Sequence, residues 1–421
     1  MPHASATRTA RVGRGWMIVF AIAWLAVWTV QLTPVQLLLP LQLDTQGGGG
    51  EWIGGVVWAG LILSVGGLAG VVAGPVAGTL SDRTLSRWGR RRPWILGGSV
   101  LTAASLVLTG AGTEPIAVGT AWIGVSTGIA VVSAALTALI ADQVEKQRGT
   151  ASALVSSAQA VGIVVGVGAV VLLGLGIAES YLVLAGFILV VGCVAAALLP
   201  DPPAVRRPLG VEAAARDRWG ALRDHDFIWL LFSRLAVNIG NALGTALLLF
   251  YLLYGVGSSA DTAEDDLLVL IVIYTVFVVA ASLVAGTISD RTGRRRTLVI
   301  ASALVQALSA VLILVSPTFV GTAIAAAVMG VGYGGYMSVS LALATDLLPD
   351  GRDNARDLGV VNVSASLGQL LGPLIGAGLV AAVGGFWLLF LAAGVLSVTG
   401  AIMTTAVRPV RESRRPDPAT R

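Results

Sequence analysis

The sequence is poor in the residue types on which disulfide bonds, metal sites and acid–base chemistry depend. Its 421 residues include one cysteine, Cys193, and two histidines, His3 and His225. A single cysteine excludes internal disulfide bonds and thiolate metal clusters. Both histidines fall outside the long apolar runs, so we expect no buried histidine metal site or proton relay. With no nucleophile–base set or phosphate-binding loop in view, we expect no enzyme activity, no cofactor and no bound metal.

Charged residues are also scarce, at 12% of the chain, against about 25% in a typical soluble domain. Hydrophobic residues reach 56%, and the mean hydropathy is +0.85. The apolar residues come in runs of roughly 20, the length that crosses a bilayer core of about 30 Å. This composition excludes a soluble domain and predicts a polytopic membrane protein surrounded by lipid.

Twelve apolar runs predict an all-α protein with twelve transmembrane helices. These helices are expected to begin near Trp16, Trp52, Trp94, Ile116, Thr150, Tyr181, Phe227, Leu267, Thr297, Phe319, Leu358 and Gly385. A stretch rich in proline and charge separates the sixth run from the seventh. We therefore expect five parts, namely a cytoplasmic N-terminal tail (1–15), an N-terminal six-helix bundle (16–199), a cytoplasmic linker (200–226), a C-terminal six-helix bundle (227–406) and a cytoplasmic C-terminal tail (407–421).

The positive charges predict the orientation of the chain. All 27 Lys and Arg residues lie in the tails or in alternate loops, except Arg234 inside the seventh predicted helix. The charges of the remaining loops are acidic only: Asp44, Glu51, Glu114, Glu179, Asp261, Glu264, Asp265 and Asp266. By the positive-inside rule both termini are cytoplasmic, and we expect the cell (plasma) membrane as the location. Because this partition accounts for the net charge of +4, we expect no nucleic-acid partner.

One motif occurs twice, about half a chain length apart. Residues 78–83 are GTLSDR and residues 286–291 are GTISDR, and each stretch is followed by GRRR, at 89–92 and at 293–296. Each copy lies between two apolar runs. A duplicated basic hairpin in a chain of repeated hydrophobic halves is typical of transporters, here with both halves pointing the same way across the membrane.

These residues resemble the signature of the major facilitator superfamily between helices 2 and 3, G-x-L-x-D-R-x-G-R-R. The second copy fits without a gap, whereas the first carries four extra residues, Leu85–Trp88, and runs on to Pro93. The longer form resembles the sucrose/proton symporters and the related glycoside–pentoside–hexuronide:cation symporters, as does Gln31-Leu32-Thr33-Pro34, more loosely. The resemblance implies the major facilitator fold and a secondary-active or facilitative transporter that works by rocker-switch alternating access.

The resemblance also implies that the twin hairpins lock the cytoplasmic side while the outer side is open. The candidate gating residues are Gly78, Asp82, Arg83, Arg90, Arg91, Asp142, Gly286, Asp290, Arg291, Arg294, Arg295 and Asp346. Their glycines would admit a neighbouring helix, and their carboxylates can accept from a helix N-terminus or pair with arginine. Asp142 and Asp346 are the expected partners of the two arginine runs. Contact of the arginines with anionic lipid headgroups is the alternative.

Glycines repeat every four residues in helix 2, at Gly66, Gly70, Gly74 and Gly78, and in helix 11, at Gly368, Gly372 and Gly376. Such stripes permit close helix packing in lipid. They fit either static packing within one half or surfaces that slide between the halves.

The resemblance assigns the substrate cavity to helices 1, 4, 7 and 10, with helices 5 and 11 beside it. The candidate substrate-binding residues are Trp28, Gln31, Gln159, Asn238, Asn241, Tyr333, Tyr336 and Gln369. Amides both donate and accept hydrogen bonds and aromatic faces cover apolar ring faces, so this set suits a small polar solute such as a sugar or glycoside. The alternative is that the amides only join helix to helix. We expect the protein to act as a monomer.

Two charged residues are candidates for the cavity. Arg234 lies about two turns into helix 7, where a charge costs a few kcal/mol. It should therefore face the cavity or a carboxylate, or else snorkel to the cytoplasmic surface, where Asp226 is near enough in sequence to be its partner. Asp44 lies at the outer end of helix 1. No carboxylate lies near mid-membrane, so a coupling proton or sodium ion and uncoupled transport both stay open. A multidrug or metabolite exporter with proton antiport, favoured by Gly372-Pro373, is the alternative function.

Overall fold

The computed structural model describes residues 12–46, 52–144, 147–201, 224–347 and 354–408. Over these ranges the chain is helical, without β-strands, and twelve of its helical spans are long and apolar enough to cross a membrane. The all-α architecture with twelve spans is thus confirmed. Most of the predicted linker and the two predicted tails lie outside the described residues.

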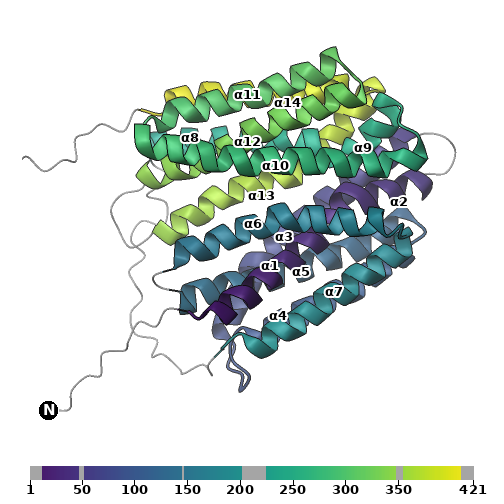
Figure 1. The fold of residues 1–421 in the computed structure, drawn as a ribbon. Helices are drawn as coiled ribbons and strands as arrows, with labels where there is room; N and C mark the ends of the chain where they lie inside the picture. The colour runs from purple at the N-terminus through teal and green to yellow at the C-terminus, as the bar shows by residue number, and fades with distance from the viewer. Residues whose placement is uncertain (1–11, 47–51, 145–146, 202–223, 348–353, 409–421) are drawn as a thin grey trace, which may run out of the picture. The chain divides into compact units, whose positions relative to one another are not determined.

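The first half contributes six spans (Figure 1). The first span is one uninterrupted helical segment. In it α1 (Arg14–Thr33) continues through a π-helical turn, η1 (Pro34–Leu38), into α2 (Leu39–Gln46). The other spans are α3 (Trp52–Arg83), α4 (Arg92–Ala111), α5 (Pro115–Gln143), α6 (Arg148–Leu172) and α7 (Ile177–Leu198). Prolines begin α4 and α5, where the missing N–H is not needed by the helix.

The second half repeats this series. Its first span is α8 (His225–Ala246), which ends before Leu247 and is followed by the short helix α9 (Leu248–Tyr251) and the π-helical turn η3 (Leu252–Val256). The others are α10 (Ala260–Thr292), α11 (Arg295–Val315), α12 (Phe319–Leu347), α13 (Asn354–Val383) and α14 (Trp387–Ala406). The expected start of the eighth span near Leu267 is wrong, because the acidic residues before it form the first turns of α10. Acidic side chains are favourable at a helix N-terminus.

The same helix pairs pack together in both halves. In the first half α1 packs against α6 and α7, and α4 packs against α5 and α7. The corresponding helices of the second half do the same, since α8 packs against α13 and α14, and α11 against α12 and α14. The sequence duplication is therefore a duplication of tertiary structure.

Large apolar side chains cover the outward faces of these helices. Leu172 and Val315, for example, are 80% and 78% exposed. Soluble proteins rarely expose contiguous apolar surface of this kind. Together with the twelve apolar spans, this surface identifies a multi-pass membrane protein.

The described chain forms two compact units, and their boundary differs from the midpoint of the sequence. The first unit contains α1 to α7 together with residues 247–254 and 259–268, and the second contains the remaining parts of the second half. Within the first unit, α9 packs against α2 and η1. Residues 247–254, which follow α8, and the first turns of α10 therefore belong, by their contacts, with the first half.

Candidate functional site

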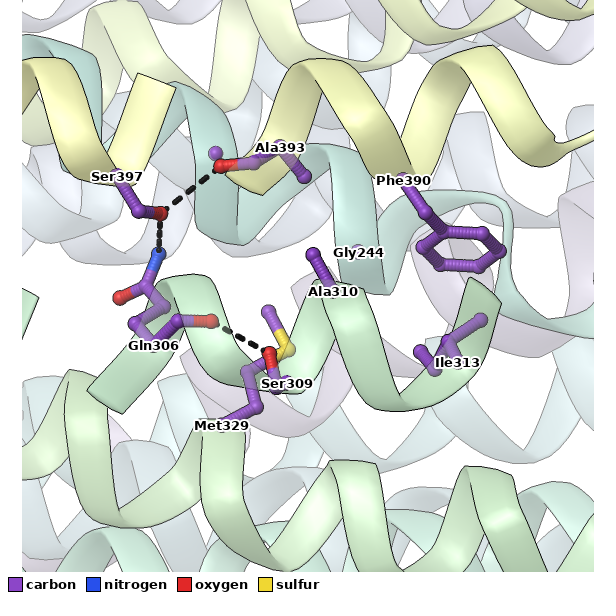
Figure 2. A pocket seen from close by; sticks show the side chains of 10 residues that line it. Gly244, Gln306, Ser309, Ala310, Ile313, Met329, Phe390, Ala393 and Ser397 are labelled. Atoms are coloured by element: carbon purple, nitrogen blue, oxygen red, sulfur yellow. Dashed lines mark hydrogen bonds between the residues drawn. The ribbon is translucent and has the colours of Figure 1, made fainter. Parts of the chain in front are cut away.

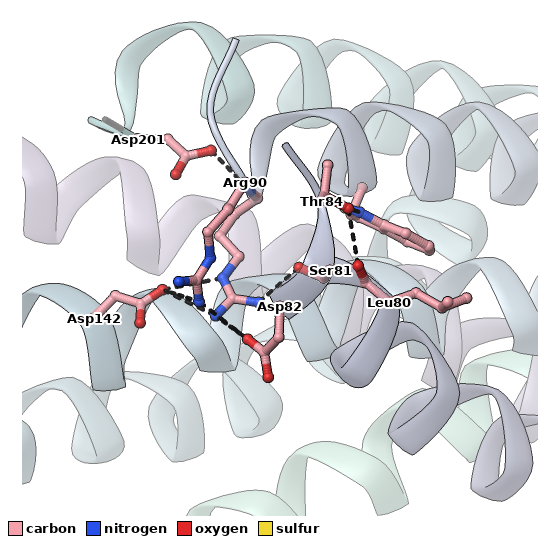
Figure 3. Close-up of polar contacts among 9 residues, drawn as sticks. Leu80, Ser81, Asp82, Thr84, Arg90, Asp142 and Asp201 are labelled. Atoms are coloured by element: carbon pink, nitrogen blue, oxygen red, sulfur yellow. Dashed lines mark hydrogen bonds and ion pairs between the residues drawn. The ribbon is translucent and has the colours of Figure 1, made fainter. Parts of the chain in front are cut away.

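The first arginine hairpin folds into a compact charge cluster at the C-terminal ends of α3 and α5 (Figure 3). Arg91 is only 3% exposed, and its guanidinium lies 2.6 Å from Asp82 and 3.0 Å from Asp142. It also donates to Ser81 Oγ at 2.7 Å. Arg90 lies 3.1 Å from the same Asp82 carboxylate. Charge-assisted bonds of this length are among the strongest hydrogen bonds in proteins.

A further carboxylate, which the sequence did not single out, closes this cluster. Asp201 follows α7 and accepts hydrogen bonds from the backbone N–H groups of Arg91 and Arg92, at 2.6 and 2.9 Å. It thereby caps the N-terminus of α4, where a negative charge is favourable. Gly89 lies against Asp201 with a φ of 105°, a conformation that side-chain-bearing residues rarely adopt. The glycine of the GRRR run is thus explained by this turn.

The second hairpin forms a looser version of the same cluster. Arg295 takes the place of Arg91, with Asp346 at 2.6 Å and Asp290 at 3.9 Å. It is 24% exposed. The buried hydroxyl of Ser289, the counterpart of Ser81, has no hydrogen-bond partner in the described part of the chain. Both clusters join residues of a single half.

The remaining gating candidates are less constrained. Arg83, Arg291 and Arg294 are exposed, and no carboxylate of the described chain lies within ion-pair distance of them. A Cβ on Gly78 would meet nothing within 4 Å, whereas one on Gly286 would lie 3.1 Å from Ser338 of its own half. Their part in gating stays a prediction.

The glycine stripes pack mainly within their own halves. A Cβ on Gly66 would lie 2.5 Å from the Trp122 ring of α5. Gly368 and Gly372 lie against Asn238 and Ala242 of α8 in the same way. These glycines therefore let α3 approach α5 and α13 approach α8, which is the static role that the sequence left open.

The polar residues of the second half form a connected network on α8. Asn238 and Asn241 lie on one helix face, and each amide oxygen accepts from a tyrosine hydroxyl: Tyr333 of α12 at 3.0 Å and Tyr274 of α10 at 2.9 Å. The two tyrosine rings stack with centroids 6.5 Å apart. Tyr274 was missed by sequence reasoning, although it is the only tyrosine in its apolar run.

Arg234 lies one turn before Asn238 and is 1% exposed, so it does not snorkel to the surface. Its Nη1 donates to Ser340 Oγ of α12, and its Nη2 lies 3.9 Å from the sulfur of Met337. The expected partner Asp226 is wrong, because its carboxylate accepts from the backbone N–H of Arg408 instead. Asp226 is one residue into α8, too far along the helix to reach the guanidinium.

The other substrate candidates have varied surroundings. Tyr336 is fully buried, and its hydroxyl shares a hydrogen bond of 2.7 Å with Ser233 between α12 and α8. Trp28 is partly buried and lies 6.3 Å from the Trp24 ring, with its indole N–H unpartnered. Gln31 and Gln159 are half-buried in the first unit, and Gln369 is exposed.

A small pocket lies among α8, α11, α12 and α14, and Figure 2 shows its lining. Gln306 donates from its amide to Ser397 Oγ and to the carbonyl of Val237, both at 3.1 Å. Its amide oxygen is buried without a partner. The pocket has room for about one water molecule, so it is too small to be the substrate site.

Another cluster, Asp44–Trp52–Tyr254, lies in the first unit. The Tyr254 hydroxyl donates to Asp44 Oδ1 at 2.7 Å, and its ring stacks on Trp52 with centroids 4.9 Å apart. Partial burial, followed by the bond to Asp44 and that carboxylate's negative charge, raises the pKa of Tyr254 to about 12. Asp44, a candidate cavity charge, therefore has a phenol donor as its partner.

A comparison with known protein families identifies the family of this chain. The family model of the Major Facilitator Superfamily matches residues 59–264 and 235–421, which together take in both halves. The chain belongs to this superfamily. It is accordingly a membrane transporter rather than an enzyme.

Two solved transporter structures share the fold of this chain. The nucleoside transporter NupG superposes with a TM-score of 0.75 at 15% identity, covering 93% of this chain and 99% of that one. A bacterial homologue of the human lysosomal transporter Spinster, in an inward-facing and occupied conformation, gives 0.77 at 14% identity, with 97% and 100% covered. At these identities the likeness shows the fold alone.

Curated relatives match over short stretches. An uncharacterized symporter of Synechocystis is 52% identical over 42 residues, 10% of this chain and 8% of its own length. The general alpha-glucoside permease of Schizosaccharomyces pombe is 49% identical over 53 residues, 13% and 10%. The sucrose transport protein SUT1 of Oryza sativa subsp. japonica is 51% identical over 43 residues, 10% and 8%. The chain thus matches about a tenth of these relatives' lengths or less.

Proposed function

We propose that this superfamily member moves a small polar solute, a sugar or glycoside, across the cell membrane by rocker-switch alternating access. The observation that carries the proposal is the network on α8, where two amides are each oriented by a tyrosine hydroxyl. An amide fixed by one bond keeps its other groups pointing in a defined direction. That preorganisation is what recognition of a hydroxyl-rich solute needs.

The free groups of this network match the chemistry of a sugar. The Asn241 amide nitrogen has no hydrogen-bond partner among the described residues, and its side chain is half-buried rather than sealed. Tyr274 and Tyr333 offer ring faces and hydroxyl oxygens with spare lone pairs. Donors, acceptors and aromatic faces within one compact unit favour a sugar over a purely lipophilic compound. The short matches to sucrose and alpha-glucoside transport proteins support the same choice.

The two arginine clusters are proposed to act at the cytoplasmic face. Both lie at the ends of spans that the distribution of positive charge assigns to the inside. We propose accordingly that both termini are cytoplasmic, and that the protein resides in the plasma membrane. Asp82 and Asp290 are 60% and 75% exposed, so each retains free acceptor capacity for a neighbouring helix. The protein is proposed to act as a monomer in contact with lipid, with a proton or sodium ion as the candidate coupling ion.

The test is counterflow in proteoliposomes with labelled sucrose and maltose, with and without a proton gradient. Saturable exchange of either sugar without a gradient, competed by the unlabelled sugar, is the expected result. Stimulation of net uptake by the gradient would add proton coupling. Absence of exchange for any sugar, together with efflux of lipophilic cations, would replace the proposal with the exporter alternative.

A further inference from the structure

The guanidinium of Arg234 is a buried positive charge without a buried negative partner. Its side chain is 1% exposed, and no Asp or Glu of the described chain lies within 4 Å of it, in contrast to Arg91 and Arg295. An uncompensated charge in a membrane interior is strongly unfavourable. A residue that persists in such a place needs a counter-ion.

The free part of this guanidinium has a defined geometry. Nη1 donates to Ser340 Oγ. Among the described residues, the buried Nε has no hydrogen-bond partner, and Nη2 meets only the Met337 sulfur at 3.9 Å. The Nε and Nη2 donors form one edge of the planar group, spaced to meet both oxygens of a carboxylate. A thioether is a weak acceptor on a flexible side chain, so Met337 can yield this edge to a better ligand.

The neighbours of this edge favour an incoming ligand over an internal partner. The Asn238 amide cannot neutralise the charge, because its nitrogen donates to the Arg234 carbonyl at 2.7 Å and its oxygen accepts from Tyr333. Arg234, Asn238 and Asn241 follow each other on one face of α8. The unpaired edge is therefore continuous with the amide network that the proposed function assigns to the solute.

We propose that Arg234 binds an anionic group of the transported solute, so that the solute is a small polar molecule bearing a carboxylate. The carboxylate pairs side-on with Nε and Nη2, and the hydroxyl-bearing part of the solute lies along Asn238 and Asn241. This inference rests on the proposed function for the transport of a small polar solute. It narrows the substrate class from neutral sugars to sugar acids or related hydroxy acids.

The experiment measures thermal stabilisation of the purified full-length protein by matched pairs of probes, at constant chloride and ionic strength. The pairs are methyl β-D-glucuronide with methyl β-D-glucoside, gluconate with glucitol, and lactate with 1,2-propanediol. In each pair the carboxylate is the main chemical difference. The proteins are wild type, Arg234→Gln, Arg234→Lys and the control Arg296→Gln, which removes a positive charge whose guanidinium donates to the Thr405 carbonyl.

We expect at least one carboxylate to raise the apparent Tm of the wild type and of Arg296→Gln by several degrees more than its neutral parent. Arg234→Gln should lose this difference, and Arg234→Lys should need about tenfold more ligand, because an ammonium keeps the charge without the two-donor edge. If Arg234→Gln fails to fold, the shift in ligand concentration for Arg234→Lys carries the test.

Equal stabilisation by both members of every pair, or no stabilisation by any carboxylate, would overturn the inference. So would a carboxylate effect that persists in Arg234→Gln. Counterflow of a neutral sugar that survives in Arg234→Gln would also overturn it while leaving the proposed function intact. Absence of exchange of every neutral sugar and of every carboxylate probe in the wild type would instead count against the proposed function.

Discussion

Replacing Arg91 by glutamine should destabilise the protein more than the same replacement at Arg295. Arg91 is 3% exposed and lies within 3.0 Å of two carboxylates, and it holds Ser81 as well. Arg295 is 24% exposed and has one close carboxylate, Asp346 at 2.6 Å. The two hairpins have nearly the same sequence, so each variant serves as the matched control of the other.

The magnitudes follow from burial and from the number of bonds lost. A hydrogen bond to a charged group is worth about 1.5–3 kcal/mol when buried, but Asp82 and Asp142 are 60% and 38% exposed and remain partly hydrated. Discounted for that screening, Arg91→Gln should cost about 2–3 kcal/mol and Arg295→Gln about 1 kcal/mol. At about 2–4 °C per kcal/mol for a bundle of this size, the apparent Tm should fall by about 4–12 °C and 2–4 °C respectively.

The assay is thermal unfolding in detergent at one scan rate, because membrane proteins often unfold irreversibly and only such values are comparable. Arg91→Lys should fall between wild type and Arg91→Gln, since lysine keeps the charge but loses the fork of donors. A Tm loss at Arg295 equal to or larger than that at Arg91 would refute the claim that burial and bond number set the difference.

Two further predictions concern the Asp44–Trp52–Tyr254 cluster and the glycines of α3. Tyr254→Phe should lower the apparent Tm by about 1–2 °C, because it removes one partly exposed hydrogen bond to Asp44. The pKa of Tyr254 is raised to about 12 in the folded protein, so the stabilisation by this bond is fully present below the unfolded pKa of about 10 and is lost as the pH rises through 12. A Tm difference between wild type and Tyr254→Phe that vanishes by pH 8 would contradict this account. Gly66→Ala should lower the stability by about 1–3 kcal/mol, because the added methyl group presses on Trp122. Gly74→Ala should leave the Tm unchanged or raise it, because a Cβ added there meets nothing within 4 Å. Equal losses of Tm in the two variants would show that Gly66 does not pack as described.

The fold could be predicted from the sequence because three separate sequence patterns indicated the same architecture. Apolar runs of membrane length, alternating positive charge and a repeated hairpin each indicated two six-helix halves. The start of α10 was wrong because acidic residues are typical of loops and also suit a helix N-terminus. The π-helical turns η1 and η3 were not predicted, since a single turn with hydrogen bonds between residues i and i+5 leaves no repeating pattern in the sequence.

The site was predictable in part. Asn238 and Asn241 stood out because their spacing places them on one helix face, but their tyrosine partners come from α12 and α10, and no local pattern states which helices adjoin. Tyr274 was missed for that reason. The partner of Arg234 was wrong because proximity in sequence suggested Asp226, whereas the helix carries the two side chains apart.

Counterflow in proteoliposomes with Asn241→Ala tests most directly whether the α8 network binds the solute. The matched control is Thr399→Ala on α14, where the deleted hydroxyl bonds only to its own helix, at the Val395 carbonyl. Asn241→Ala should raise the half-saturating solute concentration about tenfold or more, as expected when about 1.4 kcal/mol of binding is lost, while Thr399→Ala exchanges like the wild type. Unchanged half-saturation in Asn241→Ala, in a protein that unfolds at the wild-type temperature, would contradict this account.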